Sequence, residues 1–502
     1  MRLHRFHGGL RLDGHKSEST AAAIRHSCLP PELVLPLAQH AGEAATACVV
    51  VGQRVRRGER IGDAQGERSA HVHAPASGVV RAIEPRPLAH PYRVEGLCIV
   101  LVPDGATDEL RLDPLPNWQT LEPETLRERI RAAGIVGLGG AAFPTAEKLG
   151  AARHTLILNG AECEPYIACD DALLRERADQ VVLGGRVLRR VLGAQRVLLA
   201  VEDTMLEACA AARAAIATHG ADEIELVIVP TVYPEGGERQ LIRVLTGLEV
   251  PSGGAPRDLG VIVQNVGTVA ACWRAVDAGE PLLSRIVSVT GPGVNTPGNF
   301  EVAFGTPIAH LMTQAGGYTN AAERLVLGGP MMGLALPHDD FPIVKASNCV
   351  LVLSAAQVQE SAPELPCIRC GECARVCPAH LLPQQLHWFI RAADFDRTRE
   401  HGLLDCIECG CCDLVCPSHI PLVQHYRWAK TELRQRERAT QEADAARLRF
   451  EARTVRLMRN EAERVEQQAA RQLGATSVDA VQAALERARA RKRDASDKRE
   501  PS

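Results

Sequence analysis

The sequence has no long hydrophobic run. A membrane-spanning helix needs roughly 18 to 20 predominantly apolar residues, and even the strings RVLLAVED (196–203) and LVIVPTVYP (226–234) are much shorter. The opening MRLHRFHGGLRLDGHKS carries charges, and no apolar core follows it, so it does not read as a secretory signal. We therefore expect a cytoplasmic protein whose attachment to any membrane is peripheral.

The sequence also lacks a strong charge of either sign. It has 57 Lys and Arg against 61 Asp and Glu, a net charge of −4. Binding to nucleic acid requires a concentrated basic surface, so this class of protein is disfavoured. The apolar share of 46% and the charged share of 24% are ordinary for a globular protein, and 502 residues predict about three or four domains.

A lysine is missing where one structural relative would need it. Short β-like runs broken by glycine, from residue 33 to residue 102, predict a small β domain within the N-terminal region 1–115. Its pattern, with the run from Ala74 to Gly78, resembles the biotinyl/lipoyl-carrier sandwich. No lysine lies between Ile61 and Val72 to carry a prosthetic group, so we expect a sandwich without a swinging arm.

Four further segments follow, which makes the predicted fold class multidomain α/β plus β. Residues 126–278 alternate helical patterns with short buried runs, which predicts an α/β domain with a parallel sheet. Residues 285–345 resemble a soluble-ligand-binding β-grasp module, 360–425 form a helical cysteine domain, and 430–502 form a charged helical tail. An apolar stripe in the tail fits either a solvated helix or one that docks on a partner or an anionic membrane surface: Leu448, Ala452, Val455, Met458, Ala462 and Val465.

Eight of the 17 cysteines form two copies of the motif Cys-x2-Cys-x2-Cys-x3-Cys-Pro, beginning at Cys367 and Cys406. This spacing is typical of paired [4Fe-4S] clusters, in which the fourth cysteine of each motif ligates the other cluster. Zinc is the alternative, but zinc modules typically pair two Cys-x-x-Cys halves. We expect Cys411 to face away as a spectator. The predicted ligands are Cys367, Cys370, Cys373 and Cys416 for one cluster, and Cys406, Cys409, Cys412 and Cys377 for the other.

A glycine-rich loop, residues 137–145, precedes a helical stretch that contains Lys148. Such a loop lets backbone amides approach a phosphate, although it is also compatible with a plain tight turn. The loop and three later segments, 159–165, 233–238 and 264–268, are similar in order to the FMN- and NADH-binding segments of the flavin subunit of respiratory complex I. The resemblance implies an FMN site lined by Gly137, Gly139, Gly140, Lys148, Asn159, Glu162, Glu164, Asn265 and Thr268. It places Lys148 at the phosphate, and the two glutamates near the isoalloxazine and the nicotinamide.

Three positions depart from that pattern. Ala142 and Gly267 replace a glycine and an acid, and Ala161 replaces the acid usual between Asn159 and Glu162. An alternative role for Glu162 and Glu164 is a carboxylate pair that caps a helix or meets an arginine.

The whole chain up to about residue 430 resembles one family, the C subunit of the Rnf (Rsx) ion-translocating electron transport complex. The resemblance rests on the runs 6–9, 36–40 and 73–75, the flavin segments, the double cysteine motif and its flanks at 405–410 and 418–422. It implies a peripheral subunit on the cytoplasmic side of the inner membrane, with FMN and two [4Fe-4S] clusters. It also implies integral-membrane and ferredoxin-like partner subunits, and electron flow between NAD(H) and ferredoxin coupled to ion translocation.

Two other functions stay open. Ala142 and Ala161 are the reason to consider an iron-sulfur relay or scaffold that has lost its flavin. A partner-docking module with purely structural clusters is the other alternative, and clusters that never change redox state would favour it.

Overall fold

The computed structural model describes residues 2–90, 94–220, 222–358 and 363–497. The chain divides into two structural units, Met1–Arg427 and Trp428–Ser502, and the boundary lies within helix α12 (Leu422–Thr476). Residues 359–362 and 498–502 lie outside the described residues, so the start of the predicted 360–425 domain and the end of the predicted tail are not described.

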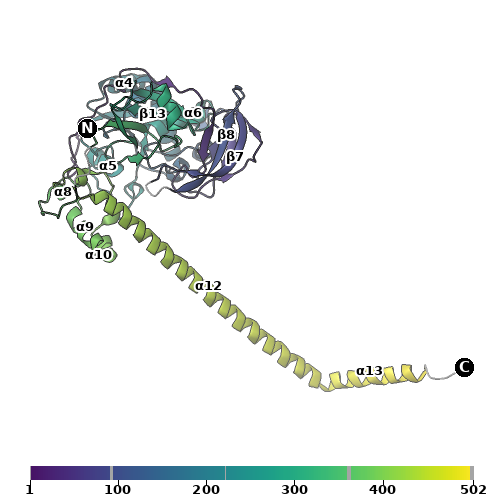
Figure 1. Ribbon diagram of the computed structural model, residues 1–502. Coiled ribbons are helices and arrows are strands. Elements are labelled where there is room, and N and C mark those ends of the chain that lie inside the picture. Colours follow the sequence, from purple (N-terminus) through teal and green to yellow (C-terminus); the bar gives the residue numbers. More distant parts are fainter. Residues whose placement is uncertain (1, 91–93, 221, 359–362, 498–502) are drawn as a thin grey trace. The chain divides into compact units, whose positions relative to one another are not determined.

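The N-terminal β module consists of two antiparallel sheets, ordered β2-β8-β7-β4 and β3-β5-β6. Leu33, Leu35 and Leu101 are fully buried in its core, because alternate residues of such strands face the same side. The hairpin of the two longest strands, β7 and β8, is marked in Figure 1. The strands are β2 (Leu33–Pro36), β3 (Thr46–Ala47), β4 (Arg54–Val55), β5 (Arg60–Asp63), β6 (Val72–His73), β7 (Gly78–Pro87) and β8 (Glu95–Pro103).

The α/β domain has a parallel sheet in the order β11-β10-β9-β12. Alternate residues of its strands enter two different cores: Leu158 and Leu199 pack with helices α3, α4 and α6, and Leu198 packs with α5. Helices therefore cover both faces, which explains the continuous apolar strands. The elements are η1 (Trp118–Thr120), α1 (Pro123–Ala132), α2 (Thr145–Lys148), β9 (Thr155–Gly160), α3 (Cys169–Leu192), β10 (Arg196–Glu202), α4 (Leu206–His219), β11 (Glu225–Val229), α5 (Glu238–Thr246), η2 (Pro256–Leu259), β12 (Val261–Asn265) and α6 (Val266–Asp277).

The third module is a six-stranded mixed sheet in the order β1-β14-β13-β17-β15-β16. It extends beyond the predicted segment 285–345, because β17 pairs with both β13 and β15, and β1 from the N-terminal region pairs with β14. Its core includes Phe300, Leu311 and Val350. The elements are β1 (Arg25–His26), β13 (Ser284–Thr290), β14 (Gly298–Ala303), α7 (Ile308–Gln314), β15 (Ala322–Leu327), β16 (Leu334–Leu336) and β17 (Cys349–Ser354).

The cysteine domain repeats one backbone pattern twice. Gly371 and Gly410, with φ of 80° and 78°, precede the matching short helices α8 (Glu372–Arg375) and α11 (Cys411–Leu414). Arg369 and Glu408, at equivalent places in the two motifs, share the left-handed region, with φ of 58° and 59°. Between the two motifs lie α9 (Pro383–Arg391), α10 (Phe395–Glu400) and η3 (Leu403–Asp405). The repeated sequence motif therefore folds into repeated turns.

The second unit is helical: α12 continues to Thr476, and α13 (Val478–Asp497) follows Ser477 (Figure 1). The stripe residues Leu448, Val455, Met458 and Val465 are exposed. Among the described residues, no helix is both long and apolar enough to cross a membrane.

Candidate functional site

A crevice is expected where the connections of the parallel sheet change direction. The chain passes from β9 through α3 to β10 on one side, whereas β12 lies on the other side of β9. Ligands of open α/β sheets bind at the carboxyl ends of strands at such a switch point. Asn159 and Asn265 are register partners at the carboxyl ends of β9 and β12. The structure thus places two of the predicted flavin residues directly at the switch point.

The glycine loop lies beside Asn265. A Cβ atom on Gly139 would lie 3.3 Å from the Cβ of Asn265, whereas one on Gly140, which has a φ of 105°, would meet no atom within 4 Å. The backbone of Leu138 donates to Thr268 Oγ1 at 2.8 Å, and Gly137 donates to the carbonyl of Phe143 at 2.8 Å. These contacts bring the loop and the start of α6 together. Because its glycines have no Cβ atoms, the loop leaves part of its backbone uncovered.

Asn265 is the N-cap of α6. Its Oδ1 accepts from the backbone of Gly267 at 2.9 Å and Thr268 at 3.4 Å, which satisfies amides that a helix start leaves free. Its Nδ2 donates to Asp170 Oδ2 at 2.6 Å. Asn159 is held similarly: its Nδ2 donates to the Gly236 carbonyl at 2.9 Å, and its Oδ1 accepts from Ala161 at 3.0 Å. Both amides therefore fix loops around the crevice.

Glu162 caps helix α3, as the alternative interpretation of this residue expected. Its carboxylate accepts from Cys169 Sγ at 3.2 Å and from the backbone of Asp170 at 3.1 Å and Asp171 at 3.2 Å. Glu164 instead accepts from the backbone amides of Met331 and Met332, both at 2.9 Å. The two glutamates thus bind different modules, and burial raises the pKa of Glu164 despite these amides.

Lys148 lies at the end of α2. Its ammonium donates to the Val263 carbonyl on β12 and to Glu238 Oε1 at the start of α5, both at 2.7 Å. The side chain is 30% exposed, so a cation stands near the carboxyl end of the sheet, on its α5 side.

The two alanines that depart from the flavin pattern both pack in hydrophobic cores. Ala142 has a φ of 46°, a conformation that favours glycine, and it is 6% exposed within the same core as Leu138. Ala161 is 8% exposed within the core that contains Leu198. Their methyl groups therefore belong to packed interiors.

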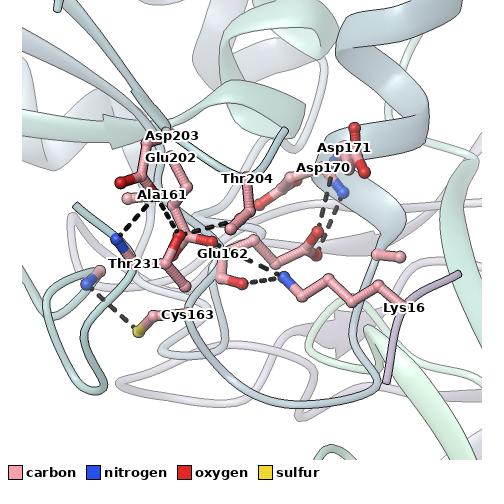
Figure 2. Close-up of polar contacts among 12 residues, drawn as sticks. Lys16, Ala161, Glu162, Cys163, Asp170, Asp171, Glu202, Asp203, Thr204 and Thr231 are labelled. Carbon is pink, nitrogen blue, oxygen red and sulfur yellow. Dashed lines mark hydrogen bonds and ion pairs between the residues drawn. The ribbon is translucent and has the colours of Figure 1, made fainter. Parts of the chain in front are cut away.

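Sequence reasoning missed four buried or partly buried ionisable residues near this crevice. Lys16 reaches the loop after β9 from the N-terminal segment, as Figure 2 shows, and donates to the carbonyl of Glu162. Burial raises the pKa of Glu202 to about 7 and of Glu235 to about 8. It also raises the pKa of Asp170 to about 7, with the charge of Glu162 adding to the effect. No local pattern marks these residues, because their partners are distant in sequence.

The two cysteine motifs line two separate cavities. One is lined by residues that include Cys367, Cys370, Cys373 and Cys416, and the other by residues that include Cys377, Cys406, Cys409 and Cys412. Each cavity therefore combines three cysteines of one motif with the fourth of the other. Four thiols around one cavity are the donor set that [4Fe-4S] clusters require, so both cavities fit that group.

The position of Cys411 differs from the one predicted from the sequence. It is completely buried and lines the second cavity instead of facing away. A hydrogen bond with Cys409 and burial raise its pKa far above that of an ordinary thiol. The reason is its place at the first turn of α11, directly beside Cys412.

The second cavity lies against the α/β domain. The Tyr233 hydroxyl donates to the Cys409 carbonyl at 2.6 Å, and Gln240 Nε2 donates to the Pro378 carbonyl at 3.5 Å. Arg239 lies 3.5 Å from Asp405. A Cβ on Gly410 would lie 2.9 Å from the carbonyl oxygen of Met331. These contacts fix residues on either side of the second cavity to the loop that follows β11, to helix α5 and to the loop before β16.

Four family descriptions match consecutive parts of the chain. They are the RnfC barrel sandwich hybrid domain at residues 4–106, the Nuo51 FMN-binding domain at 130–274, the SLBB domain at 286–335 and the 4Fe-4S dicluster domain at 366–420. The predicted fold class is thereby confirmed. The predictions of an FMN-binding domain and of an iron-sulfur dicluster domain are confirmed with it.

Several curated proteins are similar along nearly the whole chain, and each is named as the C subunit of an ion-translocating oxidoreductase complex. The one from Pseudomonas aeruginosa is 47% identical over 98% of this chain and 66% of its own length. Those from Pectobacterium carotovorum and Yersinia pestis are 46% and 45% identical over 97% and 96% of this chain, and 66% and 78% of their own lengths. The chain spans about two thirds of the length of the first two relatives.

A solved NAD+-reducing [NiFe]-hydrogenase in the air-oxidized state overlaps 57% of this chain and 58% of its own, with 22% identity and a TM-score of 0.43, which is too low to support an inference.

The curated relatives decide the family, because identity near 46% extends over nearly all of this chain, in agreement with the resemblance found in the sequence. The chain belongs to the family formed by the C subunits of ion-translocating oxidoreductase complexes.

Proposed function

We propose that this chain passes electrons between NAD(H) and a ferredoxin-like partner subunit, within a complex that couples the transfer to ion movement. The observation that carries the proposal is the contact between the α/β domain and the second cysteine cavity. Tyr233 belongs to the α/β domain that holds the crevice, and it donates to the carbonyl of Cys409 in the second cavity. A flavin exchanges a hydride pair for single electrons, and iron-sulfur clusters carry electrons singly.

The crevice residues support FMN as the group bound there. Loop glycines without Cβ atoms and the Lys148 cation suit a phosphate-bearing ligand. The proposed FMN residues are Gly137, Gly139, Gly140, Lys148, Asn159, Glu162, Glu164, Asn265 and Thr268. Because Glu162 caps α3 and Glu164 binds Met331 and Met332, we assign these two to positioning the loops rather than to direct contact with the ligand.

The cavity linings support the cross-ligated assignment of the clusters. The proposed ligands are Cys367, Cys370, Cys373 and Cys416 for the first cluster, and Cys377, Cys406, Cys409 and Cys412 for the second. The proposed partners are integral-membrane and ferredoxin-like subunits, and the proposed location is peripheral, on the cytoplasmic side of the inner membrane. The family supports both of these proposals, because its relatives are subunits of an ion-translocating complex.

The test is a joint assay of the full chain, purified without oxygen, for acid-released flavin, iron and labile sulfide. We expect near-stoichiometric FMN, about eight iron atoms and about as many sulfides, the content of two cubanes, and bleaching of the flavin absorbance on titration with NADH. Iron and sulfide without FMN, and no FMN uptake by the purified chain, would overturn the flavin assignment.

A flavin-less relay is the second candidate. The left-handed conformation of Ala142 is the observation that favours it, because a glycine would relieve the strain in this loop. The burial of this methyl in the core counts against it. The same FMN assay separates the two functions. The variant Ala142→Gly tests whether the alanine hinders FMN binding, because tighter FMN binding by that variant would mean that it does.

A further inference from the structure

The N-terminal segment crosses the carboxyl edge of the parallel sheet. Leu10 and Tyr233 exchange two backbone hydrogen bonds, of 2.7 and 2.8 Å. The backbone of Tyr166 then donates to the Gly14 carbonyl at 2.7 Å, and the rings of His15 and Tyr166 stack with centroids 4.8 Å apart. Lys16 follows immediately, so its backbone is fixed on the loop that joins β9 to α3.

The Lys16 ammonium enters a cluster of acidic residues. It donates to the Glu162 carbonyl and lies 4.0 Å from Glu202 Oε2, with 16% of its side chain exposed (Figure 2). Burial lowers the pKa of Lys16, but the charges of Glu162 and Glu202 outweigh it, so the pKa is raised above its ordinary value. The Lys16 ammonium is therefore largely but not fully buried, and it stays charged.

Glu202 needs this cation. It is completely buried at the carboxyl end of β10, and neither of its carboxylate oxygens accepts a hydrogen bond from the described residues. An unpaired carboxylate is costly to bury. Glu235, with 1% exposure and two oxygens likewise without a described partner, lies close enough that, besides burial, the charges of Glu202 and Asp203 raise its pKa. Without Lys16, the loop after β9 would face an uncompensated acidic cluster.

We propose that Lys16 is a positioning residue of the flavin crevice, contributed by the N-terminal segment, and that its fixed positive charge holds the loop 160–164 and favours an anionic ligand. The Nuo51 FMN-binding domain match begins at residue 130, so it does not include this residue. The inference rests on the proposed binding of FMN. FMN is an anionic ligand of the kind that this positive charge favours, because it carries a phosphate and becomes more negative when it accepts electrons.

The experiment compares Lys16→Met and Lys16→Arg in the full chain, with flavin removed and FMN returned by titration. We expect Lys16→Met to bind FMN roughly tenfold more weakly or worse, and to lower the midpoint potential of the bound flavin. Lys16→Arg keeps the charge, so its affinity and potential should stay near those of the wild type. Arg11→Met is the matched control, because Arg11 is an exposed cation in the same segment, and it should change neither quantity.

A double variant separates charge from folding. Lys16→Met combined with Glu202→Gln removes both members of the buried pair, and such removal is tolerated better than loss of one partner. We expect it to recover part of the FMN affinity that Lys16→Met alone loses. Equal affinity and potential in Lys16→Met and the wild type would overturn the proposal, and so would equal losses in Lys16→Met and Lys16→Arg. Failure of the wild type to take up FMN would overturn the proposed function as well.

Discussion

The two cysteine cavities have the same motif but different surroundings. In the second cavity, Cys377, Cys409 and Cys412 are 9%, 7% and 8% exposed, and contacts from the α/β domain reach Pro378, Asp405 and Cys409. In the first cavity Cys370 is exposed, and the neighbouring Ile368 is 68% exposed. Burial, charge and hydrogen bonds set the potential of a cluster. The difference teaches that one ligand pattern can stand in two environments, and we expect the two clusters to have different midpoint potentials.

The largest expected effect is the loss of one cluster. Cys409→Ser removes a proposed ligand from the buried cavity, so the iron content should fall from about eight to about four atoms per chain. Cys411→Ser is the matched control, because Cys411 is buried in the same cavity and is predicted to be a spectator. Iron analysis and electron paramagnetic resonance (EPR) of the reduced proteins would measure both. Loss of iron from Cys411→Ser would instead make Cys411 a ligand.

Cross-ligation predicts a second cluster loss of similar size, because the fourth cysteine of each motif ligates the cluster of the other motif. Cys377→Ser should eliminate the same EPR signal as Cys409→Ser, although Cys377 belongs to the other sequence motif. Cys416→Ser should eliminate the remaining signal. The opposite pairing of signals with variants would mean that each motif holds its own cluster and that the two cavities are not mixed.

A smaller change should shift the midpoint potential of one cluster without removing that cluster. Tyr233→Phe deletes the hydroxyl that donates to the Cys409 carbonyl, a bond worth about 1 kcal/mol of stability. We expect the midpoint potential of the buried cluster alone to move, with all iron retained. Thr398→Val is the control: the Thr398 hydroxyl also donates to a carbonyl, that of Asp394 at 2.7 Å, but it lines neither cavity and does not connect the cysteine domain to the α/β domain. A redox titration followed by EPR would decide, and equal shifts of both clusters would contradict the comparison.

The smallest effect on the cavities is expected from Glu301, which joins β14 to α3 and α6. Burial raises its pKa, but Arg177 at 2.7 Å and Arg274 at 3.2 Å outweigh burial and hold the pKa at about 2. Since an unfolded glutamate titrates near 4.5, the resulting stability of about 3 kcal/mol is present above pH 4.5 and lost as the pH falls toward 2.

Glu301→Gln should therefore flatten the pH dependence of the free energy of unfolding between pH 4.5 and pH 2, while both cluster signals stay unchanged at neutral pH. Glu207→Gln is the control, because Glu207 pairs with Arg175 but is 76% exposed. Denaturant unfolding at several pH values would measure the effect. A changed cluster signal in Glu301→Gln would mean that the cavities depend on the junction between the α/β domain and the β-grasp module.

The sequence alone determined the features that depend on local spacing. The three-residue steps between Cys367, Cys370 and Cys373 place their thiols around one cavity. The glycines of the loop at 137–140 have no Cβ atoms, so they leave the backbone uncovered in any surroundings. Short buried runs such as 155–160, alternating with helical patterns, predicted an α/β domain with a parallel sheet. These features depend on side-chain periodicity and on backbone freedom, and both are properties of neighbouring residues.

Only the tertiary structure decided which distant groups meet. Lys16 reaches Glu162 and Glu202, Glu164 turns to Met331, and Tyr233 reaches Cys409. The position of Cys411 inside its cavity also came from packing rather than from spacing. A buried charge or polar group must find a partner wherever the fold brings one, and no local pattern records which segment will supply it.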